Sequence, residues 1–343
     1  MFYCMLGKTC FVLSVLLITS SSMAQKPGDK VNSVFVDEFG CQWFGTDNGL
    51  LRKCGEVWNT YPVRADSPGI VNDIKHRTTP SGSVLWIGTM NGIIKINYSH
   101  NSVISASCFS SKTNSFLSDT IKRITFDKYA TCFFATPSGI GVLTDATWKF
   151  ITRITDILEN KITSAMASGD TIFFGTKGEG VARLVRSVDG YSGASSFVAP
   201  WSALAGDNIT CVFVDSKGHQ WFGTEKGLSS HSKFDAKEGW DDSFTEKLPD
   251  QYVSAIAEDK AGNIWVGTHG GLVRVRPDNS EPDKWSVGDG LASGIINDIF
   301  VDKDGSLWIG TDMGAAHFNG SGFSNIRTSD FAKNFIDYSQ FVK

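Results

Sequence analysis

The stretch Trp308-Ile309-Gly310-Thr311 decides the fold, because close copies of it recur along most of the chain. Each copy has an aromatic residue, a second apolar residue, a small residue and a threonine. The copies begin at Trp43, Trp86, Phe133, Phe173, Trp221, Trp265 and Trp308. The small residues fall at 45, 88, 135, 175, 223, 267 and 310, so successive copies are 40–48 residues apart. Seven units of this length, with turn signals in each, predict a seven-bladed β-propeller.

Each unit divides into four short strands in the same way. In the last unit an apolar strand over 295–301 is followed by a turn over 302–305, and further strands are expected over 306–311, 314–318 and 323–327. Short strands separated by Asp and Gly turns are typical of all-β folds, here with four antiparallel strands per blade. We place the apolar first strands innermost and expect the repeated aromatic residues to be buried between blades. The expected blades are 31–69, 70–118, 119–158, 159–206, 207–249, 250–293 and 294–328.

A second glycine follows the threonine by three residues in six of the units. A turn that needs a positive φ explains a glycine at this position. The fourth unit has Glu179 there, between Gly178 and Gly180, which predicts a turn shifted by one residue.

The beginning of the chain is typical of a secretory signal peptide. Lys8 precedes an apolar run over 10–18, and Ser22-Met23-Ala24 follows it, which predicts cleavage after Ala24. No later stretch approaches the length of a membrane span. We therefore expect residues 1–24 to be removed and an exported protein, periplasmic or secreted, with residues 25–328 as the propeller. The apolar tail over 329–343 would dock on the ring, form a short helix or contact a partner.

The net charge and the cysteine content limit the possible functions and disulfides further. A formal net charge of −4 gives no electrostatic basis for binding nucleic acid. If Asp47 and Asn48 form a two-residue hairpin loop, Cys41 lies directly opposite Cys54, at a separation that allows a disulfide. The cysteines after residue 24 are odd in number, so at least one thiol stays free. Cys211, inside an apolar strand, is the expected free thiol.

The units resemble two-component regulator propeller repeats. Their shared pattern is an apolar strand, Asp-x-x-Gly, then aromatic-Ile/Val-Gly-Thr-x-x-Gly-Leu, and residues 257–272 match it closely. The third and fourth units are degenerate, and the resemblance covers about 31–328. It implies an extracytoplasmic ligand-binding sensor propeller, a type found in large hybrid kinases. The sequence contains one propeller and no kinase, so a stand-alone propeller is expected and the implied role is binding, not signalling.

Polar pairs precede the first strands and are expected to ring one mouth of the channel. The candidate ligand-binding residues among them are Asn72, Asp73, Lys122, Arg123, Asn297 and Asp298. They would form a mixed-charge pocket, or they would simply solvate a water-filled channel. Loops on a rigid scaffold commonly carry function. His269, on a neighbouring hairpin loop, would transfer a proton or bind a metal, or be an ordinary exposed loop histidine. Trp201 would offer an aromatic surface to a sugar or peptide, or pack on the next blade.

These patterns leave three functional hypotheses. The first is a non-enzymatic binding module for a glycan, peptide or protein, without a cofactor. The second is a propeller lyase or hydrolase that uses His269, with or without a divalent metal, which rests on analogy of fold. The third is a scaffold subunit of a cell-surface assembly. No His pair has metal-ligand spacing, and no Gly-x-Ser-x-Gly or phosphate-loop motif is present.

Overall fold

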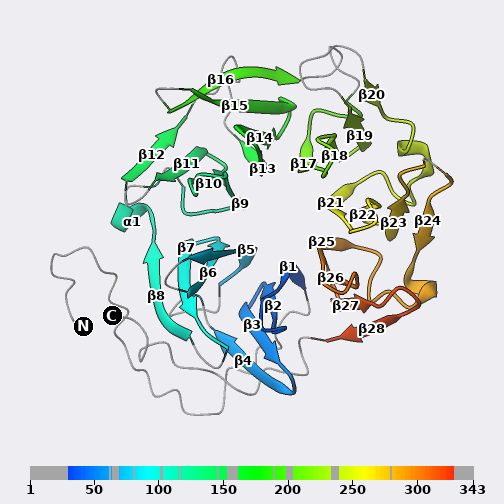
Figure 1. Ribbon diagram of the computed structural model, residues 1–343, viewed down its shortest axis with the longest axis horizontal. Coiled ribbons are helices and arrows are strands. Elements are labelled where there is room, and N and C mark those ends of the chain that lie inside the picture. The colour runs from blue at the N-terminus through cyan, green and yellow to red at the C-terminus, as the bar shows by residue number, and fades with distance from the viewer. Residues whose placement is uncertain are drawn as a thin grey trace.

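The computed structural model describes residues 30–327, except 62, 64–68, 80–81, 101–102, 115, 117, 145–146, 153–160, 188–189, 198–203, 233–238 and 279, and except the side chains of 192–197. Seven antiparallel sheets of four strands stand in a ring around a central channel (Figure 1). The prediction of a seven-bladed β-propeller is therefore confirmed. The expected signal peptide and the tail over 329–343 lie outside the described residues.

In every blade the first strand lies innermost and the fourth at the rim (Figure 1). Blade 1 consists of β1 (Val31–Val36), β2 (Gln42–Thr46), β3 (Gly49–Cys54) and β4 (Val57–Tyr61). Blade 2 consists of β5 (Val71–Thr79), β6 (Gly82–Thr89), β7 (Gly92–Tyr98) and β8 (Val103–Phe109), followed by the short helix α1 (Ser111–Asn114). Blade 3 consists of β9 (Arg123–Phe126), β10 (Cys132–Thr136), β11 (Gly139–Thr144) and β12 (Thr147–Ile151). Blade 4 consists of β13 (Ile162–Ser168), β14 (Thr171–Thr176), β15 (Val181–Ser187) and β16 (Gly190–Phe197).

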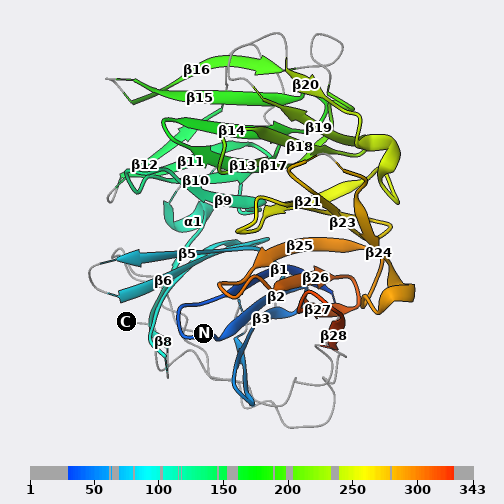
Figure 2. The ribbon, with the colours of Figure 1, turned by 45° about the vertical axis from the view of Figure 1, so that its right-hand side comes forward.

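The second half of the ring repeats this order. Blade 5 consists of β17 (Ile209–Val214), β18 (Gln220–Thr224), β19 (Gly227–His231) and β20 (Trp240–Asp241), followed by η1 (Thr245–Lys247). Blade 6 consists of β21 (Val253–Glu258), β22 (Ile264–Thr268), β23 (Leu272–Val275) and β24 (Asp283–Trp285), followed by η2 (Val287–Asp289). Blade 7 consists of β25 (Ile296–Val301), β26 (Leu307–Thr311), β27 (Gly314–Phe318) and β28 (Phe323–Ile326). The oblique view in Figure 2 shows the sheets of successive blades lying against one another.

The hydrophobic core lies between the blades, and the repeated aromatic residues are part of it. All seven are buried, with no more than 8% of any of them exposed. In blades 1, 5 and 6 the indole Nε1 also donates a hydrogen bond to the first Asp of the preceding turn. Trp265, for example, donates to Asp259 Oδ2 at 2.9 Å. The Asp-x-x-Gly turn and the aromatic residue therefore form one local unit, which explains why they recur together.

The glycine of the repeated motif lets the next blade approach closely. A Cβ atom on Gly267 would lie 2.5 Å from Cγ2 of Ile296, the first residue of the innermost strand in blade 7. The same clash would occur between Gly45 and Val71, at 2.5 Å from Cγ1. A side chain at this position would therefore push neighbouring blades apart.

We expect Gly267→Ala to lower the free energy of unfolding by about 1–3 kcal/mol, the usual range for overpacking a close-packed core. Ile296 is fully buried and cannot move aside without disturbing its own neighbours. Denaturant unfolding of the variant measures the effect. Gly322→Ala is the matched control, since a Cβ there meets nothing within 4 Å. Equal stability of the two variants would contradict this account of how the blades pack.

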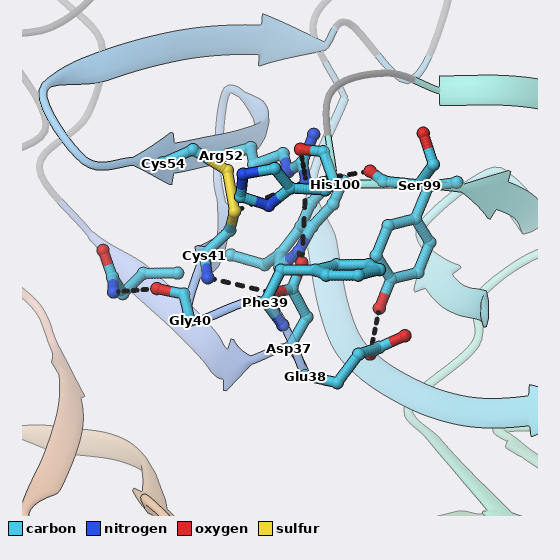
Figure 3. Close-up of polar contacts among 12 residues, drawn as sticks. Asp37, Glu38, Phe39, Gly40, Cys41, Arg52, Cys54, Ser99 and His100 are labelled. Carbon is cyan, nitrogen blue, oxygen red and sulfur yellow. Dashed lines mark hydrogen bonds and ion pairs between the residues drawn. A yellow bond between two sulfur atoms is a disulfide. The ribbon is translucent and has the colours of Figure 1, made fainter.

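A disulfide joins Cys41 to Cys54 in blade 1 (Figure 3). Cys41 precedes β2 and Cys54 ends β3, so the bridge closes the hairpin at the end away from its turn. Arg52, beside the bridge, donates hydrogen bonds from Nη2 to the carbonyl oxygens of Ser99 and His100 in blade 2, at 3.2 and 2.9 Å. The bridged hairpin of blade 1 is thereby fastened to blade 2.

The two faces of the ring differ in the turns that they carry. One side of the ring carries the turns between second and third strands, such as Asp47-Asn48. The segments that lead into the first strands lie on the same side, which we call the loop face. Backbone hydrogen bonds link the turns to these leading segments, as from the N–H of His269 to the carbonyl oxygen of Tyr252 at 3.1 Å. The opposite face carries the turns between first and second strands, such as 37–40.

Candidate functional site

Most of the innermost strands contain a β-bulge near their start. The first residue of the polar pair predicted for the channel mouth lies at this bulge, as Asn72 and Asn297 do. Its side chain commonly bonds to the next blade. Asn72 Nδ2 donates to the carbonyl oxygen of Ile121 in blade 3 at 2.8 Å. Asn297 Nδ2 donates to the carbonyl oxygen of Val31 at 3.0 Å and so connects blade 7 to blade 1. The structure thus gives these two amides a part in joining blades and closing the ring.

Asp73 and Asp298 occupy the second position of their pairs and also reach the following blade. Asp73 Oδ2 accepts a hydrogen bond from the backbone N–H of Ile124 at 2.7 Å. Asp298 Oδ2 accepts from the N–H of Val34 at 2.9 Å and from the hydroxyl of Ser33 at 3.0 Å. Burial raises the pKa of Asp298, and nearby positive charge together with the bond from the Val34 N–H opposes the rise.

The positive charge near Asp298 comes from Arg123 and Lys75. Arg123 Nη1 donates to the carbonyl oxygen of Asn72 at 2.9 Å, and its charge counteracts the raised pKa of Asp298. Lys75 Nζ lies 3.6 Å from Asp73 Oδ1. Side chains of both charges therefore lie close together here, but most of these polar groups already have partners in the protein.

The backbone N–H of Lys122 donates a hydrogen bond to the carbonyl oxygen of Ala135 at 2.8 Å. Ligand binding by Lys122, Arg123 and the other polar residues at the channel mouth stays a prediction. Trp201 lies outside the described residues.

His269 lies on the turn between β22 and β23, on the loop face, and its ring stacks on Tyr252. The ring centroids are 3.9 Å apart and the planes are inclined by 14°. Burial raises the pKa of Tyr252, and the carboxylate of Glu225 raises it further, which places Glu225 of blade 5 near this pair. Among the described residues, no group of three His, Cys, Asp or Glu side chains is arranged to hold a metal ion.

A polar cleft of about 250 Å³ opens on the loop face between blades 4 and 5. Its lining consists of Gly178, Gly206, Asp207, Asn208, Glu225 and Lys226. Among these residues, Asn208 Nδ2 donates a hydrogen bond to Glu225 Oε2 at 2.8 Å. Both Glu225 and Lys226 are exposed.

The cleft is built by the irregular turn of blade 4. Thr176 Oγ1 bonds to the carbonyl oxygen of Gly180, four residues on, whereas the other blades make this bond over three residues. The amides of Gly178 and Gly180 both donate to the carbonyl oxygen of Asp207, at 3.2 and 3.0 Å. The displaced glycines are the sequence signal for this turn, but their spacing by itself does not indicate a cleft.

Comparison with known proteins supports the architecture. The sequence pattern of the two-component regulator propeller family matches residues 247–270 and 290–313. No curated protein matches the chain. Among solved structures, the chain is similar to the extracellular domain of BT3049 from B. thetaiotaomicron, described as a hybrid two-component system, with 23% identity and a TM-score of 0.70 over 86% of this chain and 40% of that one.

Two further structures are similar. The extracellular domain of BT4673 from B. thetaiotaomicron, described as a one-component system, gives 17% identity and a TM-score of 0.62, over 87% of this chain and 49% of that chain. A virginiamycin B lyase from Staphylococcus aureus gives 13% identity and a TM-score of 0.64, over 87% of this chain and 96% of the lyase. The chain spans less than half the length of the two extracellular domains, and these identities show likeness of fold alone.

In the part of the chain that the structure describes, no helix has the length and apolar character needed to cross a membrane. The repeated motif, the ring of seven four-stranded sheets and the family match agree with one another. The chain is a seven-bladed propeller, and two of its segments, 247–270 and 290–313, match the repeat of the two-component regulator propeller family.

Proposed function

We propose that this protein is an exported, non-enzymatic binding propeller of the sensor type, which takes a polyhydroxylated ligand such as an oligosaccharide on its loop face. The polar cleft between blades 4 and 5 carries this proposal. The likeness in fold between this chain and extracellular domains of sensor systems supports an exported location and a sensor-type function. Sites on propeller faces suit this role because loops vary on a rigid ring.

The chemistry of the cleft fits sugar hydroxyl groups. Glu225 contributes an exposed carboxylate, Asn208 an amide and Lys226 an ammonium group, and Gly178 and Gly206 complete the lining. Closely spaced acceptors and donors of this kind fix the orientation of a polar ligand.

An aromatic surface stands beside the cleft. His269 is exposed and Tyr252 is partly exposed, and the two rings stack in parallel near Glu225. A flat pair of rings next to a carboxylate offers a sugar both a stacking surface and a hydrogen-bond acceptor. The channel mouth is a weaker candidate, because Asn72, Asp73 and Asp298 are engaged between blades.

Titration calorimetry of residues 25–343 with neutral oligosaccharides tests this proposal. We expect Glu225→Gln to weaken binding about tenfold without lowering the melting temperature, because a hydrogen bond to a charged acceptor contributes about 1.5–3 kcal/mol. Asp47→Asn is the matched control. Asp47 has the same turn position in blade 1 and accepts an amide hydrogen bond from Asn32 at 2.8 Å, as Glu225 does from Asn208.

Equal weakening by the two variants would show that the turn carboxylates act on the fold and not on the ligand. Binding of peptides without any binding of oligosaccharides would reject the ligand class. The lyase or hydrolase alternative predicts turnover of a bound ligand that His269→Ala abolishes, and the scaffold alternative predicts no small ligand at all.

A further inference from the structure

The face opposite the loop face carries an exposed tyrosine between two cations. Tyr129 lies on the turn between β9 and β10 in blade 3, and 51% of it is exposed. The guanidinium carbon of Arg186, from β15 in blade 4, lies 3.8 Å from the centroid of its ring. Lys128 Nζ lies 5.1 Å from the same centroid. Both distances are within the range of cation–π attraction.

Buried groups beneath this surface hold it in one arrangement. Asp127 is buried, and its Oδ1 accepts hydrogen bonds from the N–H of Tyr129 at 2.9 Å and of Thr131 at 2.7 Å. Its Oδ2 lies 3.6 Å from Arg186 Nη1 and accepts the hydroxyl hydrogen of Tyr191. Burial and the hydrogen bond to the Asp127 carboxylate raise the pKa of Tyr191 to about 12. A contact surface that is already ordered loses little entropy on binding.

The surface is locally cationic on an acidic chain. Arg77 Nη1 donates to the carbonyl oxygen of Ala130 at 3.1 Å and adds a third positive charge to Lys128 and Arg186. The exposed carboxylate among these groups is that of Asp170, 3.1 Å from Lys128 Nζ, since Asp127 is buried. The formal net charge of the whole chain is −4. The patch therefore differs in sign from the protein as a whole.

The corresponding turn of blade 1 shows that this charge is not a general feature of the fold. Phe39 occupies the same turn position as Tyr129 and is 42% exposed, but Glu38 precedes it where Lys128 precedes Tyr129. The blade 3 turn also has Ala130 at a φ of 75°, where blade 1 has Gly40 at 77°. The left-handed region is unfavourable for alanine, so the turn keeps this shape against a local penalty.

We propose that Arg77, Lys128, Tyr129 and Arg186, named here the Tyr129 surface, form an interaction site for an acidic peptide segment of a partner protein. The tyrosine ring packs against the peptide, and Lys128 and Arg186 pair with its Asp or Glu carboxylates. Tyr and Arg side chains carry a large share of binding energy at protein interfaces. The site lies on the face opposite the loop-face cleft, so a partner and a small ligand bind without excluding each other.

Fluorescence anisotropy of a labelled hexaglutamate peptide, titrated with residues 25–343 at low ionic strength, tests the proposal. We expect saturable binding that weakens as salt is added, because exposed charges are screened. Lys128→Gln and Tyr129→Ala should each weaken binding about fivefold, a loss of about 1 kcal/mol. Neither side chain is buried, so both variants should keep the melting temperature of the parent. Arg186 is left unchanged, because its removal would leave the buried Asp127 without its ion pair.

Phe39→Ala is the matched control, and it should bind hexaglutamate as tightly as the parent protein does. A labelled hexaglutamine peptide should not bind. Absence of saturable binding, or equal weakening by Phe39→Ala and Tyr129→Ala, would overturn the proposal. Binding of a sulfated polysaccharide in the absence of hexaglutamate binding would also reject a peptide partner.

Discussion

Trp265→Ala is expected to lower the free energy of unfolding by about 3–5 kcal/mol, the usual cost of deleting a fully packed aromatic side chain. Trp265 is 3% exposed, and its ring stacks on Trp285 with centroids 5.3 Å apart. The guanidinium of Arg274 lies 5.4 Å from its centroid on the neighbouring strand. Truncation would leave a cavity between blades 6 and 7 and would remove the indole donor from Asp259.

Denaturant unfolding followed by tryptophan fluorescence and by circular dichroism measures this loss. Trp265→Phe is the matched control, because it keeps an aromatic ring between the blades and removes the smaller part of the indole together with the hydrogen bond to Asp259. We expect that variant to lose about 1–2 kcal/mol. A near-neutral Trp265→Ala would mean that the repeated aromatic residues do not hold the blades together.

Reduction of the Cys41–Cys54 disulfide is expected to lower the free energy of unfolding by about 3 kcal/mol. The bridge closes a short loop, with its two cysteines 13 residues apart, and a loop of this size restricts the unfolded chain by about that amount. Arg52 Nη2 also donates to Cys41 Sγ at 3.4 Å, so release of the bridge would loosen the buried arginine that fastens blade 1 to blade 2. Thermal unfolding with and without reductant measures the effect.

A double variant, Cys41→Ala with Cys54→Ala, should be insensitive to reductant and serves as the control. Thiol titration of unfolded, unreduced residues 25–343 should give three thiols, from Cys108, Cys132 and Cys211. Five thiols would show that the bridge does not form. Cys132 and Cys211 are buried, and burial raises the pKa of both thiols, so they should react slowly in the folded protein.

The number of blades could be predicted from the sequence because the interactions that repeat are local. Thr268 Oγ1 donates to the carbonyl oxygen of Gly271 at 2.8 Å, and Gly271 has a φ of 139°. Asp259 and Trp265 are six residues apart and bond directly. The spacing of Cys41 and Cys54 followed from the same hairpin register, in which Gln42 pairs with Lys53. Each of these contacts joins residues that a pattern within one unit contains.

The candidate site could be predicted only in part, for the same reason. The sequence predicted that Asn297 and Asp298 lie at the channel mouth, but it did not reveal their partners Val31 and Val34, which are more than 260 residues away in the sequence. A residue's type and local spacing do not say whether its polar group faces solvent or the next blade. The expectation of a pocket at the mouth therefore could not distinguish ligand contacts from blade contacts.

The sequence by itself determined the strand pattern, the turns and the repeat, because each depends on residues a few positions apart. Only the tertiary structure decided which polar groups form hydrogen bonds between blades when the ring closes. It also decided that the shifted turn at Gly178 opens a cleft beside Glu225, and that Arg186 covers Tyr129 from the neighbouring blade. These arrangements depend on how one blade meets the next, and that contact is set by the closure of the whole ring.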